Sequence, residues 1–172
     1  MIYIIPTDTC FWIACPIEDI DAYKTIYTLK KRPYDKPLAI MVEDFEYLER
    51  TTYIQKSQID FLKSYRRPFT VLVETKRNFI SELVPNKGKY KKTAFRVAHS
   101  ALQKKLIKGV WPLFLTSANI SGDIETYKVS ELPFTESKKV QILADSDLEI
   151  TLPSDIFEFR WNSNEVIYLR KY

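Results

Sequence analysis

Short apolar runs of strand length alternate with segments of helical periodicity along most of this chain. Such alternation predicts a layered α/β domain whose sheet is at least partly parallel. Some of the runs follow one another too closely for a helical crossover to fit between them. The sequence therefore predicts an α/β (α+β) fold with a twisted mixed β-sheet and flanking helices. The expected strands lie at 2–5, 71–73, 95–98, 113–116, 140–144 and 166–169.

Four segments have the apolar spacing of amphipathic helices. The first, 19–31, opens with Asp19 and Asp21, closes with a cluster of cations, and is followed by Pro33, which stops a helix. The others lie at 44–50, 55–65 and 100–108. A chain of 172 residues has the size of one ordinary domain, so we expect residues 1–172 to share one core.

Composition excludes several kinds of site. The chain has three glycines, and none lies in a glycine-rich phosphate loop, so side chains must do much of any phosphate binding. Cys10 and Cys15 are too few for a disulfide scaffold and lack further ligands for a structural zinc site. We expect both thiols to be free, and Cys10 to be an inert core thiol. The single His99 excludes a histidine-rich metal site.

Nothing in the sequence has the features of a membrane segment or a secretion signal. No apolar run approaches the ~20 residues that span a bilayer. Met1 leads directly into a strand-like run without the basic start of a signal peptide. We therefore expect a cytoplasmic location and no membrane partner.

Charge is distributed unevenly along the chain. Residues 63–108 contain thirteen Lys or Arg against two acids, a net charge of +11, which leaves −7 for the rest of a chain whose net charge is +4. A segment this basic favours an anionic partner, either a nucleotide or RNA. The alternative is a set of solvated cations on several unrelated faces.

Two groups of short polar side chains follow expected strands. Thr7-Asp8-Thr9 comes after the first strand and Pro6, and Thr116-Ser117-Ala118-Asn119-Ile120-Ser121-Gly122 continues the strand at 113–116. Ligands of α/β proteins bind at strand ends, where hydroxyl and amide groups can hold a small polar substrate or a phosphate. Taken alone, each group is also compatible with an ordinary turn.

A third group, 29–38, places four cations within seven residues, between a helix end and a strand. Pro33 and Pro37 stiffen this connection, so it presents its cations from a semi-rigid loop. Fixed Lys and Arg side chains suit triphosphate binding. The alternative is that these cations only interact with the carbonyl end of the helix.

Together and in this order, the motifs resemble the YrdC-like family, over nearly the whole chain. The matching segments are Pro6-Thr7-Asp8-Thr9, Lys30-Lys31-Arg32-Pro33, Lys36-Pro37-Leu38, Pro68 with Thr70, Phe95-Arg96-Val97, Thr116 to Gly122, Pro153-Ser154-Asp155-Ile156 and Leu169-Arg170.

The resemblance implies a twisted mixed sheet whose concave, basic face binds ATP and threonine. It implies the activity of a threonylcarbamoyl-AMP synthase, a nucleotidyltransferase that converts L-threonine, bicarbonate and ATP into L-threonylcarbamoyladenylate and pyrophosphate. Mg²⁺ normally accompanies the ATP. A further enzyme system, the threonylcarbamoyl-transferase complex, then modifies adenosine 37 of tRNA.

Residue roles carry over by motif. The reaction joins two anions, so it needs positioning and charge neutralisation, which we assign to Lys30 and Arg32. No protein side chain is assigned to the metal. The resemblance places ATP on Lys30, Arg32, Asn119, Ser154 and Arg170, and threonine on Thr7, Arg96 and Ser117.

The chain departs from the family pattern at two motifs. Phe11-Trp12-Ile13 stands where Tyr-Gly-Leu is typical, and Arg66-Arg67-Pro68-Phe69-Thr70 replaces Pro-Gly-Pro-x-Thr. The leading helix and the second, C-terminal domain of longer members have no counterpart. A paralogue like YciO, with another substrate, is therefore an alternative. The loop-like segment 78–92 is a candidate lid.

An RNA-binding module is the alternative from a different class. The basic segment interleaves its cations with Tyr65, Phe69, Phe79, Tyr90 and Phe95, the side-chain types that bind looped or single-stranded RNA. Core packing explains the same aromatics. RNA binding would weaken steeply with salt, whereas productive ATP binding would need threonine and metal.

Overall fold

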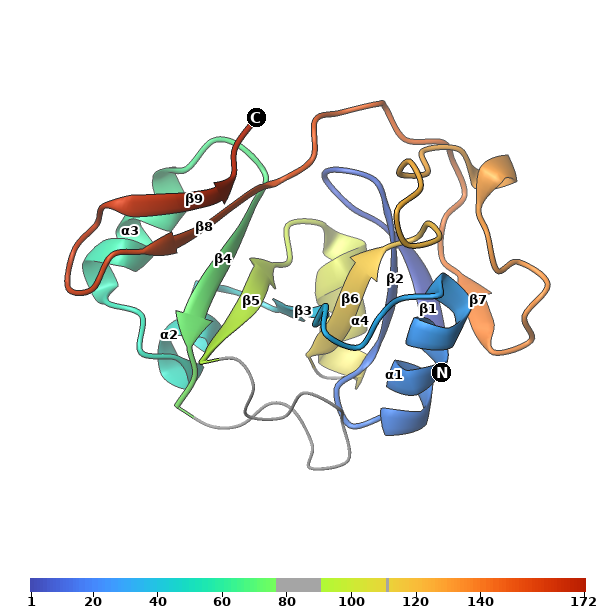
Figure 1. The fold of residues 1–172 in the computed structure, drawn as a ribbon, viewed down its shortest axis with the longest axis horizontal. Helices are drawn as coiled ribbons and strands as arrows, with labels where there is room; N and C mark the ends of the chain where they lie inside the picture. The colour runs from blue at the N-terminus through green and yellow to red at the C-terminus, as the bar shows by residue number, and fades with distance from the viewer. Residues whose placement is uncertain (77–90, 111) are drawn as a thin grey trace.

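The computed structural model describes residues 1–76, 91–110 and 112–172. In this part of the chain, nine strands form one mixed sheet, with the order β7-β1-β2-β6-β3-β5-β4-β8-β9 (Figure 1). The pairs β1/β7, β3/β5 and β4/β8 are parallel, and the other neighbours are antiparallel. The twisted mixed sheet expected from the sequence is confirmed.

The strands are β1 (Ile2–Pro6), β2 (Phe11–Pro16), β3 (Ala39–Val42), β4 (Phe69–Glu74), β5 (Lys92–Val97), β6 (Leu113–Ser117), β7 (Val140–Ile142), β8 (Asp155–Phe159) and β9 (Val166–Arg170). All six strand runs expected from the sequence are present. The sequence-based assignment gave no range for β3, which it only implied as the strand after residue 38, and it missed β2 and β8. The candidate lid, 78–92, falls almost wholly outside the described residues; its last residue, Lys92, begins β5.

The helices α1 (Ile20–Lys30), α2 (Phe45–Thr51), α3 (Lys56–Ser64) and α4 (Ala101–Val110) agree with the expected segments to within two residues. Local chemistry explains the starts of α1 and α2. Asp19 accepts a hydrogen bond from the backbone N–H of Ala22 at 2.9 Å, and Asp44 accepts one from that of Tyr47 at 2.7 Å. A short 3₁₀ turn lies at Val129–Glu131.

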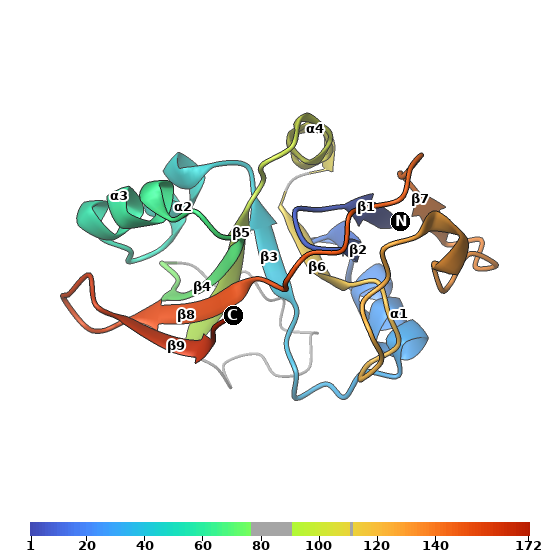
Figure 2. The same cartoon turned by 90° about the horizontal axis from the view of Figure 1, so that it is seen from above.

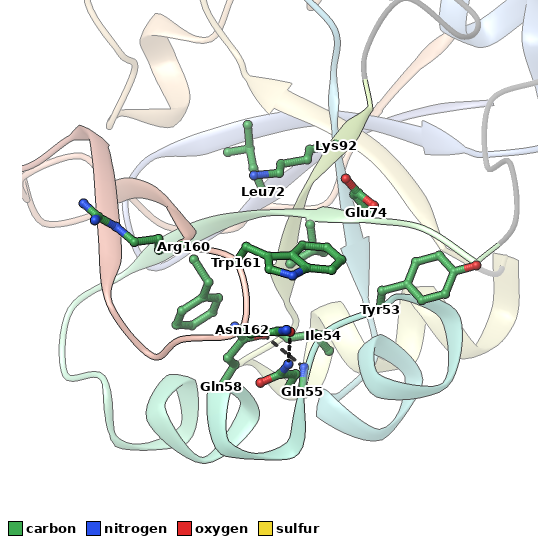
Figure 3. Close-up of a pocket in the computed structure, with 12 residues that line it drawn as sticks. Tyr53, Ile54, Gln55, Gln58, Leu72, Glu74, Lys92, Arg160, Trp161 and Asn162 are labelled. Atoms are coloured by element: carbon green, nitrogen blue, oxygen red, sulfur yellow. Dashed lines mark hydrogen bonds between the residues drawn. The ribbon is translucent and has the colours of Figure 1, made fainter.

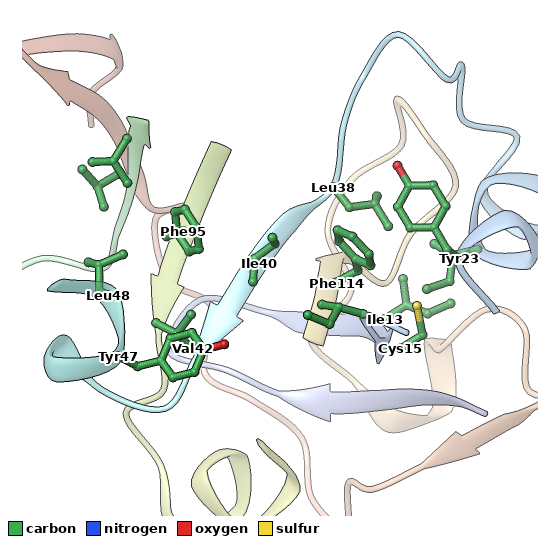
Figure 4. Packing of buried hydrophobic residues seen from close by; sticks show 14 of the residues in the cluster. Ile13, Cys15, Tyr23, Leu38, Ile40, Val42, Tyr47, Leu48, Phe95 and Phe114 are labelled. Atoms are coloured by element: carbon green, nitrogen blue, oxygen red, sulfur yellow. The ribbon is translucent and has the colours of Figure 1, made fainter. Parts of the chain in front are cut away.

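Alternate side chains of the strands point to opposite faces of the sheet. The larger cluster, on one face, includes Ile13 of β2 and Ile40 of β3, together with inward residues of α1, α2 and α3 (Figure 4). The smaller cluster, on the other face, includes Ala14 and Met41 with Leu106 of α4. Figure 2 accordingly shows α1 and α4 on opposite sides of the sheet.

Among the described residues, α4 packs on only part of its face of the sheet, and a cleft opens on the same face over β5, β4 and β8, which we call the open face. The side chains of Thr70, Arg96 and Ile156 belong to this face, because their strand neighbours Val71, Phe95 and Phe157 belong to the larger cluster on the other one. Strand pairing thus brings polar residues from distant parts of the sequence together above the open face.

Candidate functional site

A cleft of about 270 Å³ lies on the open face of the sheet. Its floor is apolar and includes Ala39, Ala94, Leu115 and Ile156. The cleft is slightly smaller than the ~300–1,000 Å³ usual for a ligand of drug size, so a ligand of that size would be enclosed only in part. Its polar walls are Thr9, Trp12, Arg32, Thr70, Thr116, Ser117, Glu125, Tyr127, Ser154 and Arg170.

The charge of the cleft walls is positive. Arg32 and Arg170 are the cations among the lining residues, and Glu125 is the one acid. Both arginines lie outside the basic segment 63–108. Among the described residues, that segment therefore contributes no cation to the lining of the cleft.

Several cations of the basic segment are instead paired with acids from the acidic remainder of the chain. Lys92 contacts Glu158 at 2.9 Å, and Lys108 contacts Glu43 at 3.5 Å. Arg67 and Arg96 make similar pairs, with Asp155 and Asp8. Four of the ten described cations of the segment are thus paired with acids from outside it, and this removes part of the electrostatic argument for RNA binding.

Lys30 is the most buried cation of the predicted site, with 1% of its surface exposed. It is the last residue of α1, and its ammonium reaches across to the end of β6. There Nζ donates to the carbonyl oxygen of Ser117 at 2.5 Å, to the carbonyl oxygen of Asn119, and to Asn119 Oδ1 at 3.2 Å. An ammonium has three N–H donors, and these three oxygens use all of them.

Burial lowers the pKa of Lys30 to about 8, and the nearby Arg32 acts in the same direction. In this structure Lys30 lies behind the cleft wall and holds Ser117 and Asn119 in place. Direct contact between Lys30 and a phosphate stays a prediction, and it would require the ammonium to release one of its three oxygens.

Asn119 is similarly occupied. Its Oδ1 accepts a hydrogen bond from Ser117 Oγ at 2.6 Å, and its Nδ2 donates to the carbonyl oxygen of Asp123 at 2.6 Å. Asn119 therefore shapes the loop after β6, while Ser117 presents its hydroxyl oxygen on the cleft wall.

Arg32 has an orientation fixed by backbone carbonyls. Nε donates to the carbonyl oxygen of Lys36 at 2.9 Å, and Nη2 donates to that of Pro37 at 3.1 Å. The loop itself is anchored because the hydroxyl of Tyr27 also donates to Lys36 O, at 3.0 Å. A guanidinium has five N–H donors, so Arg32 retains donors for a ligand in the cleft that it lines.

Arg170, at the end of β9, lies on the opposite wall. Its Nε and Nη2 donate to the carbonyl oxygen of Ser154 at 3.0 and 2.8 Å. Nη2 also contacts Ser154 Oγ at 3.2 Å, and that hydroxyl lies 3.2 Å from the hydroxyl of Thr70. Arg170, Ser154 and Thr70 thus form one hydrogen-bonded wall of the cleft.

Arg96 lies beside the cleft, not on its lining. It forms a buried ion pair with Asp8, and its guanidinium carbon lies 4.7 Å from the centre of the Trp12 ring. Burial lowers the pKa of Arg96, although the Asp8 carboxylate acts in the opposite direction. Its Nη1 is buried and has no hydrogen-bond partner among the described residues. Such an atom indicates a position where an acceptor of a ligand would be bound.

The turn between β1 and β2 organises Trp12. The indole Nε1 donates to Thr9 Oγ1 at 3.2 Å, and Thr9 Oγ1 lies 3.1 Å from Thr7 Oγ1. Thr7 Oγ1 donates in turn to the carbonyl oxygen of Cys10 at 2.8 Å, so this hydroxyl closes the turn. Burial raises the pKa of Cys10 to about 11, in keeping with the inert thiol expected from the sequence.

The structure therefore divides the eight predicted site residues into two layers. Four line the cleft: Arg32, Ser117, Ser154 and Arg170. The other four lie behind it, each bonded to a part of the wall or to a neighbouring side chain: Lys30, Asn119, Thr7 and Arg96.

The sequence-based assignment did not include Thr9, Thr70, Glu125 or Tyr127 as site residues, although all four line the cleft. Thr9 and Thr70 belong to motifs of the family resemblance, so those motifs could have identified them as site residues. Glu125 and Tyr127 lie in an irregular loop after Gly122, where the sequence has no periodicity to place them.

A larger cavity, of about 530 Å³, lies at the other end of β4 and β8 (Figure 3). Its lining includes the buried apolar residues Ile54, Val73 and Phe159, and Trp161 borders it with 80% of its surface exposed. There Gln55 Nε2 donates to Asn162 Oδ1 at 2.8 Å, which joins α3 to the β8–β9 turn. None of the motif residues lines this cavity, so the smaller cleft is the better candidate site.

Among the described residues, no group of three or more His, Cys, Asp or Glu side chains is arranged to hold a metal ion. No helix in this part of the chain combines the length and the apolar character that crossing a membrane requires.

The chain is similar to known proteins over nearly its whole length. The family model Sua5_yciO_yrdC, described as "Telomere recombination", matches residues 1–171. The threonylcarbamoyl-AMP synthase of Vibrio vulnificus is 28% identical over 162 residues, which cover 90% of this chain and 85% of that protein. The enzyme of the same name from Serratia proteamaculans is 26% identical over 156 residues, covering 88% and 81%.

Solved structures show the same fold. Sua5 of P. abyssi in complex with L-threonine superposes with a TM-score of 0.79 at 26% identity, over 98% of this chain and 49% of that one. The present chain thus spans about half the length of that Sua5. E. coli YciO, at 16% identity, has a TM-score of 0.75 over 99% of this chain and 82% of its own, which supports the fold alone.

Proposed function

The chain belongs to the Sua5/YciO/YrdC family, and on this basis we propose that it is a threonylcarbamoyl-AMP synthase. The reaction would use L-threonine, bicarbonate and ATP, and would release L-threonylcarbamoyladenylate and pyrophosphate. Two relatives that match this chain over more than four fifths of their own length are named threonylcarbamoyl-AMP synthases, which supports this assignment.

One observation carries the proposal most directly: two oriented guanidinium groups face one small cleft. Arg32 and Arg170 each donate two of their N–H groups or more to backbone carbonyls, and each retains others for a ligand. Pre-oriented arginines bind phosphate oxygens as planar forks without losing much conformational freedom. We assign them to the triphosphate, with the hydroxyls of Ser117 and Ser154 beside them.

The chemistry follows from the charges. The threonine amine and bicarbonate form a carbamate and water, and a carbamate oxygen then attacks the α-phosphorus while pyrophosphate leaves. The attacking and leaving groups are both anionic, so the main requirements are positioning and neutralisation. Arg32 and Arg170 meet these requirements without a protein nucleophile.

Lys30 acts in this proposal through the wall that it supports. Its ammonium fixes the carbonyl of Ser117 and both oxygens of Asn119, so the Ser117 hydroxyl is held at one position in the cleft. A positive charge behind the wall also adds to the potential that an anionic ligand experiences.

The threonine side of the site is assigned to the Arg96 region. The unpartnered, buried Nη1 of Arg96 is a donor that suits a carboxylate oxygen. Trp12 lies on the same guanidinium and lines the cleft, so it limits the space for the amino-acid side chain. Thr9 and Thr7 set the position of that indole.

Mg²⁺ fits this site as a companion of ATP and not as a metal held by the protein alone. Mg²⁺ is commonly bound by substrate phosphates, waters and one or two carboxylates. Glu125 is the carboxylate that lines the cleft, so it is the side chain that would approach a phosphate-bound Mg²⁺. Bound there, the ion would neutralise charge on the phosphates.

We further propose that residues 1–172 act as one domain in the cytoplasm. The product would pass to the enzyme system that modifies tRNA, with tRNA or a threonylcarbamoyl-transferase complex as the downstream partner. The pairing of Lys92 and Lys108 with acids leaves an RNA-binding module with less support than the enzyme.

The test is pyrophosphate release by the purified protein with ATP, Mg²⁺ and bicarbonate, in the presence of threonine, of serine, or of no amino acid. Release that depends on both threonine and bicarbonate supports the synthase. Release with another amino acid would instead identify a paralogue whose pocket is altered at Trp12. No release under any condition would contradict the proposal.

A further inference from the structure

A buried carboxylate lies directly behind the Arg170 wall of the cleft. Asp155, the first residue of β8, has no exposed surface. Its Oδ2 accepts hydrogen bonds from the hydroxyl of Tyr65 at 2.6 Å and from Nε of Arg67 at 3.0 Å, and its Oδ1 accepts one from the backbone N–H of Tyr172 at 2.9 Å. Burial raises the pKa of Asp155, but these bonds outweigh burial and hold the pKa below its usual value.

This carboxylate is adjacent in sequence to a residue that positions a cleft arginine. Ser154 is the acceptor for Nε and Nη2 of Arg170, and Asp155 follows it directly. The backbone N–H of Asp155 also donates to the carbonyl oxygen of Pro68 at 2.9 Å, at the start of β4. A shift of the backbone at Asp155 would therefore also shift the neighbouring Ser154 carbonyl, which accepts the hydrogen bonds of Arg170.

Arg67 is the one cation that contacts this carboxylate among the described residues. It also places Nη2 3.4 Å from the carbonyl oxygen of Pro153, so it touches both sides of Ser154. Its side chain is 36% exposed, whereas that of Asp155 is fully buried. Arg67 thus approaches from solvent and fastens the segment 153–155 from outside the cleft.

We propose that Arg67 is a positioning residue for the nucleotide, acting through Asp155 on Ser154 and Arg170. This inference rests on the proposed function, because it concerns the ATP side of the same cleft. It gives a role to the second arginine of Arg66-Arg67, which pairs with a buried carboxylate.

Without Arg67, Asp155 would keep its bonds from Tyr65 and Tyr172 but would lose its counter-charge in a buried position, which is a strongly unfavourable arrangement. A shift of the 153–155 segment toward solvent would relieve it. That shift would displace the Ser154 carbonyl and with it Arg170, and a small misplacement of a phosphate ligand has a large effect on catalysis.

The experiment compares three variants. Arg67→Ala removes the pair, and Arg67→Lys keeps the charge with a poorer geometry. Arg66→Ala is the matched control, because Arg66 is exposed, adjacent and of the same charge, and makes no hydrogen bond among the described residues. For each, the Kd for ATP is measured by calorimetry, and KM for ATP and for threonine by pyrophosphate release.

We expect Arg67→Ala to raise the Kd and KM for ATP by about tenfold or more, with KM for threonine changed by less than about twofold. Arg67→Lys should recover part of the loss, and Arg66→Ala should resemble the wild type. Equal losses of ATP affinity in Arg66→Ala and Arg67→Ala would mean that only the net positive charge of this segment matters, and not the contact of Arg67 with Asp155. A lowered Tm in Arg67→Ala with unchanged ATP affinity would leave Arg67 a purely structural role. Either result overturns the proposal.

The two measurements also separate this inference from the proposed function. A wild-type protein that binds ATP but releases no pyrophosphate with threonine contradicts the function, and the Kd values of the variants then decide the role of Arg67. A wild-type protein that binds no ATP overturns both.

Discussion

Replacement of Lys30 by Met tests whether a charged ammonium is buried behind the cleft. The pKa of about 8 in the folded protein, against the ordinary 10.5, means that the unfolded chain binds more protons than the folded protein between these two values. The stability of the wild type, relative to a variant without this group, should therefore rise with pH in that range. From pH 7 to pH 10 the two pKa values give a relative gain of about 2.5 kcal/mol, at 1.36 kcal/mol per unit of pKa.

The assay is urea unfolding of the wild type and Lys30→Met at several pH values between 7 and 10, followed by circular dichroism. The difference between the two free energies of unfolding is the quantity of interest, because it cancels the titration of all other groups. Lys31→Met is the control, since Lys31 is exposed and its removal changes the same charge. A flat difference would refute the reasoning, because it would mean that the three oxygens around Nζ compensate fully for burial.

Three further predictions concern the cleft. Arg32→Ala should lower kcat/KM for pyrophosphate release by tens to about a thousandfold, a loss of about 2 to 4 kcal/mol of transition-state stabilisation. The control Lys31→Ala should stay within about twofold of the wild type. Full pyrophosphate release by both Arg32→Ala and Lys30→Ala would contradict the assignment of these residues to the phosphates. Trp12→Ala should raise KM for threonine by about 2- to 30-fold through loss of the contact with Arg96, with KM for ATP unchanged, as steady-state kinetics would show. Asp155→Asn should destabilise the protein by about 2 to 4 kcal/mol at pH 7 in urea unfolding. Because the folded pKa of Asp155 is lowered, this difference should shrink as the pH falls below its ordinary value of 3.8, and a constant difference would contradict that.

Helices and strands with a regular spacing of apolar residues could be predicted from the sequence. The missed strands β2 and β8 show where this spacing is not sufficient. The four helices and six of the strands follow from apolar spacing and caps such as Asp19. β8 begins with Asp155, which has the appearance of a loop residue in the sequence because acids are seldom buried. Only the fold supplies Arg67 and Tyr65 as partners for it, from a segment some ninety residues away.

The charge pattern was a weaker guide than the motifs. The excess of +11 in 63–108 predicted an anionic partner, yet Arg67, Lys92, Arg96 and Lys108 pair with acids from outside that segment. The net charge of a segment counts its own cations and acids, but it does not include acids from other segments that lie beside those cations in the fold. Neighbours are set by strand pairing, which a linear count does not include.

Motif membership predicts the site residues, but the backbone decides which of them line the cleft. Lys30 and Arg32 are two residues apart, and both were assigned to phosphate. Between them, Lys31 caps α1 in the left-handed conformation, with φ of 50°, and its backbone N–H bonds back to the helix carbonyls. This reversal sends the Lys30 side chain under the end of β6 and the Arg32 side chain to the cleft. Lys30 therefore supports the cleft wall from behind, whereas Arg32 lines the cleft. The sequence motif alone does not distinguish these two positions.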